Sequence, residues 1–100
     1  MGFRTEEEEG ALEGMSLDEY LVKNREATFM LRMRGNGMRE AAIADGDLLV
    51  VDRSREPQPH DIVVAVIDGA FCARYMRDLQ RSDLGDVRVE AVVIAVIRRL

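Results

Sequence analysis

The chain has 100 residues, which is enough for one small domain with a single core. Its hydrophobic fraction of 47% predicts that it folds, and its net charge of −5 argues against direct binding to duplex DNA. The sequence has no apolar run of the roughly 18–20 residues that a membrane span needs, and no signal-peptide pattern. A single cysteine, Cys72, excludes an internal disulfide. These features together predict a cytoplasmic protein that makes no membrane contact.

Residues 1–14 are rich in glycine and glutamate and include four consecutive glutamates, Glu6–Glu9. Like charges repel one another, so this composition predicts a flexible, solvated acidic arm, with a partner-contacting arm as the alternative. The domain proper is expected to cover residues 15–100.

A capping box marks the start of the domain. The Ser16 hydroxyl can accept a hydrogen bond from the Glu19 N–H, and the Glu19 carboxylate can reach back to the Ser16 N–H. The box predicts a helix from Leu17 to about Lys23, with one apolar face buried through Leu17, Tyr20 and Leu21.

Residues 27–34 alternate as a strand does, with Phe29, Leu31 and Met33 on one face. A glycine-framed turn follows at residues 35–37. Asn-Gly within it is also a strong hairpin signal, but residues 38–42 lack β alternation. The pattern therefore favours a strand, a turn and then a short helical segment over residues 38–43.

The second half of the chain is a series of apolar strands separated by turns. An Asp-Gly-Asp turn leads into the strand 48–51, and the polar loop 53–60 leads into the strand 61–67, which is apolar on both faces. An Asp-Gly turn at 68–69 then joins the strand 70–76, and a polar loop precedes the strand 87–97. The pattern predicts a mostly β fold, twisted and largely antiparallel, with one or two short helices.

Several of these segments resemble the LexA/UmuD family of self-cleaving, serine peptidase-like proteins, and most closely its processed UmuD form. The resemblance begins at Ser16 and weakens after Met76. It is carried by SLDEYL at 16–21, DGDLLVVDRS at 45–54, and DIVVA at 61–65 followed by Asp-Gly. Even the start, Met-Gly-Phe, resembles that of UmuD after its own processing. The resemblance implies the LexA/UmuD-type β fold.

The family cleaves a peptide bond with a serine nucleophile and a neutral lysine base, and this sequence has neither at the corresponding positions. The serine position is Gly37, which has no side chain, and the lysine position is Arg74, which stays protonated in proteins. The segment between residues 76 and 87 is also shorter than in the family, and the family's cleavage dipeptide is missing from the N-terminal arm. The sequence therefore predicts a catalytically dead pseudo-peptidase.

The sequence gives little support for a catalytic cysteine, a metal site or a cofactor site. Cys72 lies two residues before Arg74 on the same strand face, but no second base accompanies it, so a buried structural cysteine is expected. One cysteine and one histidine do not make a metal site, and no phosphate-binding loop is present, so neither metal nor cofactor is expected.

The resemblance implies a homodimeric accessory subunit of an error-prone, UmuC-like Y-family translesion polymerase in the SOS response to DNA damage. A RecA filament and a LexA-like repressor are further partners that it implies. The alternative function is a stand-alone dimerisation module, related to LexA or phage repressors, that regulates repressor assembly. A third reading, an active peptidase with relocated residues, is disfavoured by the two substitutions.

The last strand supplies the expected dimer interface. It is apolar on both faces, so a small monomer would leave one face exposed or one edge unpaired. An ordinary central strand is the alternative. The predicted interface residues are Val92, Val93, Ile94 and Val96.

Overall fold

A computed structural model describes residues 10–80 and 84–100 of the chain. In these residues five antiparallel strands form one sheet with the order β1-β2-β5-β3-β4. The bounds are β1 (Thr28–Arg32), β2 (Leu48–Asp52), β3 (Ile62–Ile67), β4 (Ala70–Tyr75) and β5 (Val87–Ile97). The helical segments are α1 (Leu17–Leu21) and the 3-10 turns η1 (Arg25–Ala27), η2 (Arg39–Ala41) and η3 (Met76–Gln80). The predicted mostly β, antiparallel fold is confirmed.

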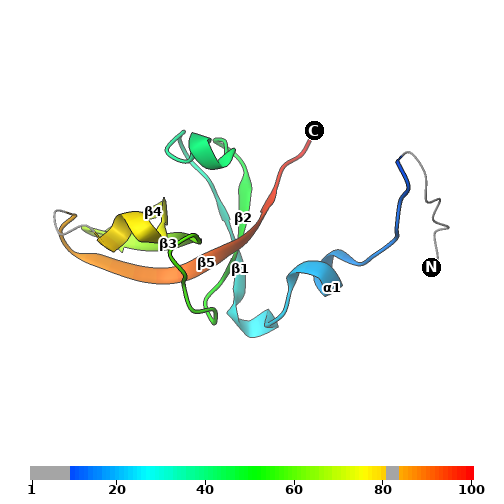
Figure 1. Ribbon diagram of the computed structural model, residues 1–100, viewed down its shortest axis with the longest axis horizontal. Helices are drawn as coiled ribbons and strands as arrows, with labels where there is room; N and C mark the ends of the chain where they lie inside the picture. The colour runs from blue at the N-terminus through cyan, green and yellow to red at the C-terminus, as the bar shows by residue number, and fades with distance from the viewer. Residues whose placement is uncertain (1–9, 81–83) are drawn as a thin grey trace.

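The long strand β5 organises the sheet, because the two hairpins β1-β2 and β3-β4 each pair with a different half of it (Figure 1). β2 pairs with residues 92–97 of β5 and β3 pairs with residues 87–92. The register shifts at Val50/Val51 in β2 and at Val64/Ala65 in β3. Such irregularities increase the local twist of a sheet. Among the described residues of β5, Val92 alone has a strand partner on each side.

Both faces of the sheet carry buried apolar side chains, which explains why the strand 61–67 has no polar face. The cluster on the first face lies beneath the segment between β1 and β2, and contains Met33, Met38, Ile43, Leu49, Val51, Val64, Ala73 and Ala91. The cluster on the second face includes Leu79 of η3, and contains Val63, Ala65, Leu79 and Val92. η3 therefore covers one side of the β3-β5 half, in a stretch that the sequence predicted to be loop from residue 78 onward.

The N-terminal helix differs from the prediction. The Glu19 N–H does lie 3.5 Å from the Ser16 Oγ, as the capping box requires, but α1 ends at Leu21 rather than near Lys23. Leu17 and Tyr20 are each 64% exposed and Leu21 is half-buried, so the predicted burial of this face is wrong. In Figure 1 α1 lies to one side of the sheet, and neither core cluster includes a residue of α1.

The predicted acidic arm falls mostly on residues 1–9, which lie outside the described residues, as does part of the predicted loop at 81–83. Residues 10–16 are exposed and have no helix or strand. Within the described ranges, no helix is long and apolar enough to cross a membrane.

Candidate functional site

The loop between β1 and β2 is held in place by its own backbone. Beyond the end of β1, the Met33 N–H donates to the Asp47 carbonyl at 2.8 Å, and the Gly46 N–H donates to the Met33 carbonyl at 2.8 Å. Gly46 has φ +92, a conformation that glycine adopts without the steric cost of a side chain. The Asp45 carboxylate accepts the Gly35 N–H at 2.7 Å across the loop. The first two residues of the Asp-Gly-Asp motif therefore shape the turn and position the Gly35–Gly37 segment.

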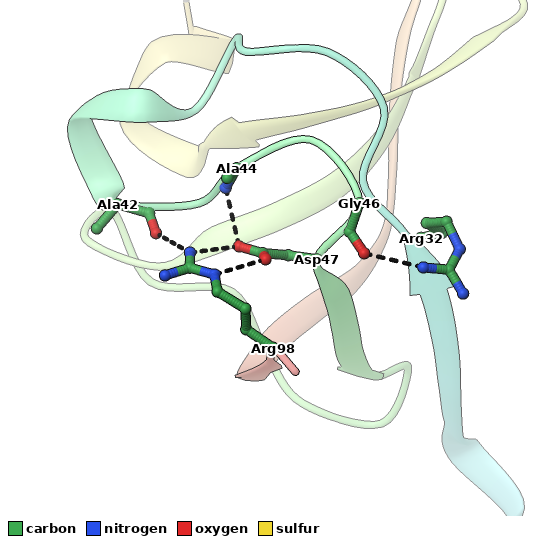
Figure 2. Close-up of polar contacts among 6 residues, drawn as sticks. All are labelled: Arg32, Ala42, Ala44, Gly46, Asp47 and Arg98. Atoms are coloured by element: carbon green, nitrogen blue, oxygen red, sulfur yellow. Dashed lines mark hydrogen bonds and ion pairs between the residues drawn. The ribbon is translucent and has the colours of Figure 1, made fainter. Parts of the chain in front are cut away.

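The third residue of the motif, Asp47, ties this loop to the end of the chain (Figure 2). Its carboxylate is 3% exposed and accepts two hydrogen bonds from Arg98, at 2.8 Å from Nε and 2.6 Å from Nη2. Arg98 Nη2 also donates to the Ala42 carbonyl, and the Ala44 N–H donates to Asp47 at 2.8 Å. The hydrogen bonds from Arg98, and then that from Ala44, lower the pKa of Asp47 from 3.8 to about 2. The pairing also raises the pKa of Arg98. This ion pair was missed in the sequence, because nothing local links positions so far apart.

Apolar packing completes the support of the loop. Met38 is 4% exposed and Ile43 is 2% exposed, and both belong to the first core cluster. The Ile43 N–H donates to the Met38 carbonyl at 3.2 Å across η2. The strand-turn-helix prediction is confirmed here, and the rival hairpin at Asn36-Gly37 does not form.

A cleft of about 570 Å³ opens beside this loop, and residues from both edge strands of the described sheet line it. Its floor is apolar and buried, and consists of Met33, Leu49, Val64 and Ala73. Its walls carry two exposed apolar side chains, Leu31 and Phe71, and three arginines, Arg32, Arg34 and Arg74. Gly37 and Cys72 complete the lining.

The structure brings Gly37 and Arg74 together in this cleft. A Cβ built on Gly37 would lie 4.0 Å from Nη1 of Arg74, and no other heavy atom outside its chain neighbours lies within 4 Å of it. Arg74 Nη1 donates to the carbonyl of its neighbour Ala73 at 2.8 Å. Glycine has no side chain here and Arg74 presents a guanidinium, so this pair offers neither a hydroxyl nor an amine.

Apart from the Cys72 thiol, the described lining contains no side chain that could serve as the nucleophile or the base of a peptidase dyad. Among the described residues that line the cleft there is no serine, threonine, histidine or lysine. Cys72 is half-buried rather than buried, so the predicted burial is wrong, because β4 is an edge strand whose side chains meet the open cleft. Its thiol lies 3.6 Å from the Ala70 carbonyl. No group of three or more histidine, cysteine, aspartate or glutamate residues in the described chain could hold a metal ion.

The residues predicted to form a dimer interface have different exposures. Val92 is 2% exposed and packs inside its own monomer, Val93 and Ile94 are half-buried, and Val96 is 40% exposed. Val93 and residues 95–97 of β5 have strand partners in β2, while the register shift leaves Ile94 without one, and the described pairings give residues 93–97 no partner on their other side. This half-open edge favours the interface prediction, whereas Val92 cannot contribute an exposed surface.

A second hollow, of about 420 Å³, lies between α1 and the β1-β2 half of the sheet. Apolar side chains from α1, β1 and β5 line it, including Leu17, Met30 and Ile97. With Leu17 64% exposed and Met30 60% exposed, this side of the molecule presents an uncovered apolar surface near the same end of β5.

Comparison with known proteins agrees with the fold and the motifs. Residues 1–92 match the Peptidase S24-like family. The chain belongs to this family. It is 42% identical to protein ImpA of Salmonella typhimurium over 73 residues, which are 73% of this chain and 50% of the relative. It is 43% identical to protein MucA of Escherichia coli over 60 residues, which are 60% of this chain and 41% of the relative.

A LexA repressor, from Clostridium acetobutylicum, is 41% identical over 76 residues, which cover 69% of this chain and 37% of the repressor. The chain thus spans about half the length, or less, of the curated relatives that it matches. The resemblance to LexA/UmuD-type proteins seen in the sequence is confirmed.

Proposed function

We propose that this S24-family domain is a catalytically inactive, UmuD-like accessory subunit of an error-prone translesion polymerase, acting as a homodimer in the SOS response. The observation that carries the inactive state is the pair of residues in the cleft. By the family resemblance Gly37 corresponds to the nucleophile and Arg74 to the base, and the two residues lie near one another in the cleft.

Neither residue can perform its step. Attack on a peptide carbonyl needs a hydroxyl or thiol at the nucleophile position, and glycine has no side chain. Accepting the proton needs a base that is neutral near the operating pH, and the guanidinium of arginine keeps its proton. Members of a catalytic unit act together, so the loss of either one removes most of the rate.

The polymerase role rests on the similarity to ImpA and MucA and on the UmuD-like sequence motifs. The homodimer rests on the apolar surface around α1, β1 and the half-open edge of β5. An exposed strand edge beside exposed apolar side chains is a surface that pairs with another chain.

A regulatory module is the second candidate function, and the similarity to a LexA repressor favours it. In that case the dimer would bind a LexA-like repressor rather than a polymerase. The acidic net charge of −5 disfavours duplex DNA as a direct ligand in both cases, because phosphate binding requires a basic surface.

A cleavage assay tests the inactive state. The wild-type chain and a LexA-type substrate are incubated together at about pH 9–10, where a larger fraction of a lysine of ordinary pKa near 10.4 is neutral than at pH 7. No fragment is expected from either protein. The double variant Gly37→Ser with Arg74→Lys should produce weak specific cleavage, and each single variant none. Specific fragments from the wild type that persist in Gly37→Ala would overturn the proposal.

A pull-down tests the partner. Immobilised dimer is offered a purified UmuC-like polymerase and, separately, a purified LexA-like repressor, both at physiological salt. Retention of the polymerase alone is the expected result. Retention of the repressor alone would replace the polymerase role by the regulatory one.

A further inference from the structure

The arginines of the cleft have no acidic partner in the described chain. Six ion pairs join the described residues, and none of them includes Arg32, Arg34 or Arg74. Arg32 Nη1 donates to the Gly46 carbonyl at 2.9 Å and Arg74 Nη1 to the Ala73 carbonyl, so each is oriented by a neutral backbone oxygen. Three positive charges thus line one cleft in a protein whose net charge is −5.

The rest of the cleft fits an extended chain rather than a single small anion. Leu31 of β1 and Phe71 of β4 are 41% and 72% exposed, and both border the cleft above its buried apolar floor. β1 and β4 are also the two edge strands of the described sheet, and a strand edge presents backbone N–H and C=O groups that an extended peptide can bind. The volume of about 570 Å³ is that of a site for a few residues.

From this arrangement we infer that the cleft is a binding groove for an extended acidic peptide of a partner protein, in which carboxylates flank an apolar residue. The carboxylates pair with the guanidinium groups of Arg32, Arg34 and Arg74, and the apolar side chain packs between Leu31 and Phe71. Arginine suits this role because its planar guanidinium can bind a carboxylate through two parallel hydrogen bonds.

In this proposal, arginine in place of a base supplies a charge that binds the carboxylate ligand. A neutral lysine would accept a proton and contribute no charge, whereas Arg74 adds a permanent positive charge to the groove. The absence of a side chain at Gly37 leaves open the space in front of that guanidinium, since a Cβ there would lie 4.0 Å from it. The same two substitutions that remove cleavage therefore favour retention of a carboxylate ligand.

Fluorescence polarisation provides the test. The probe is a fluorescein-labelled heptapeptide with a central leucine, two glutamates on each side of it and a glycine at each end. The matched probe has glutamines in place of the glutamates. The glutamate probe should bind at least about tenfold more tightly, because charge-assisted hydrogen bonds contribute more than neutral ones. Equal affinity for the two probes would overturn the proposal.

Variants then locate the site. Arg34→Gln and Arg74→Gln should each weaken the glutamate probe by about tenfold, since a hydrogen bond to a charged group is worth roughly one factor of ten or more. Arg55→Gln is the matched control, because Arg55 is exposed in the loop after β2 and outside the cleft. Unchanged affinity in both cleft variants, or an equal loss in the control, would contradict the proposal.

Cys72 gives an independent readout, because it is the one cysteine of the sequence and lines the cleft. Bound glutamate probe should slow the reaction of this thiol with a disulfide reagent, while the glutamine probe should not. An unchanged reaction rate at saturating probe would refute binding in this cleft. A single-stranded oligonucleotide that displaces the peptide and binds more tightly would also overturn the proposal, in favour of a phosphate ligand.

The proposed groove does not depend on the identity of the polymerase partner. An experiment can also distinguish a groove that does not bind peptide from a site that does cleave peptide. Mass spectrometry of the probe after incubation should recover it intact. Cleaved probe would contradict the inactive state while supporting occupancy of the groove, and intact but unbound probe would contradict the groove alone.

Discussion

Replacing Ile43 with alanine tests whether the loop beside the cleft depends on core packing. Ile43 is 2% exposed, and its N–H donates to Met38, which packs in the same cluster. The change removes three buried carbon atoms, worth about 0.8 kcal/mol each, or about 2.4 kcal/mol of transfer free energy. The cavity left behind raises the expected loss to about 3–4 kcal/mol, within the roughly 2–5 kcal/mol typical of such truncations.

Urea unfolding followed by far-ultraviolet circular dichroism is the suitable assay, because the sequence has no tryptophan. The midpoint should fall without a change in slope, since the slope reports the surface exposed on unfolding. Leu12→Ala is the control, because Leu12 is 77% exposed and its truncation should change the free energy of unfolding by less than about 0.5 kcal/mol. A loss below about 1 kcal/mol for Ile43→Ala would refute the packing argument.

Acid titration tests the buried carboxylate of Asp47. Its pKa is lowered from 3.8 to about 2, so its contribution to stability is complete above 3.8 and is lost as the pH falls through about 2. Arg98→Met should flatten the stability curve between those pH values, and a curve as steep as that of the wild type would contradict the assignment. Gly37→Ala should raise the free energy of unfolding by about 0.4–1 kcal/mol, whereas Gly35→Ala, at φ +86, should lower it by about 1–2 kcal/mol; equal urea midpoints would refute the difference in backbone conformation. Val96→Glu should shift the sedimentation coefficient from dimer to monomer, and an unchanged dimer would exclude this surface as the interface.

Strand positions were predictable because the signals that set them are local. Alternation located β1, an apolar run between Pro59 and Gly69 located β3, and a run rich in β-branched residues located β5. The bounds predicted for the last strand, 87–97, are those of β5 in the structure. Pairing between distant strands follows from no such local signal, and the division of β5 between two hairpins could not be read from its sequence.

Burial at the N-terminal end was predicted wrongly because amphipathicity states which face could be buried and not whether anything covers it. The Ser16 side chain caps α1 as expected, and yet Leu17 and Tyr20 remain exposed. The burial of Cys72 failed for a related reason. Its strand was identified, but its place at the edge of the sheet depends on strand order, which alternation does not encode.

The cleft was predictable in part. The resemblance to a known family singled out Gly37 and Arg74, and the structure places them opposite one another. Alternation along a strand places Arg32 and Arg34 on the face opposite Leu31, so the pattern alone does not bring these three side chains to one opening. All three line the cleft, because it lies at the end of β1, where side chains of both faces border the opening.

The support of this site is physically separate from the residues that would perform chemistry in it. The loop is held by Asp45 through the Gly35 N–H, by Asp47 through Arg98, and by Ile43 through core packing. None of these contacts involves a side chain at position 37 or the guanidinium of Arg74, which bonds to its own neighbour. Under the proposed inactive state, the absence of a nucleophile and a base therefore removes no contact that holds the described loop. The cleft keeps its support without them, and its walls present positive charge and apolar surface.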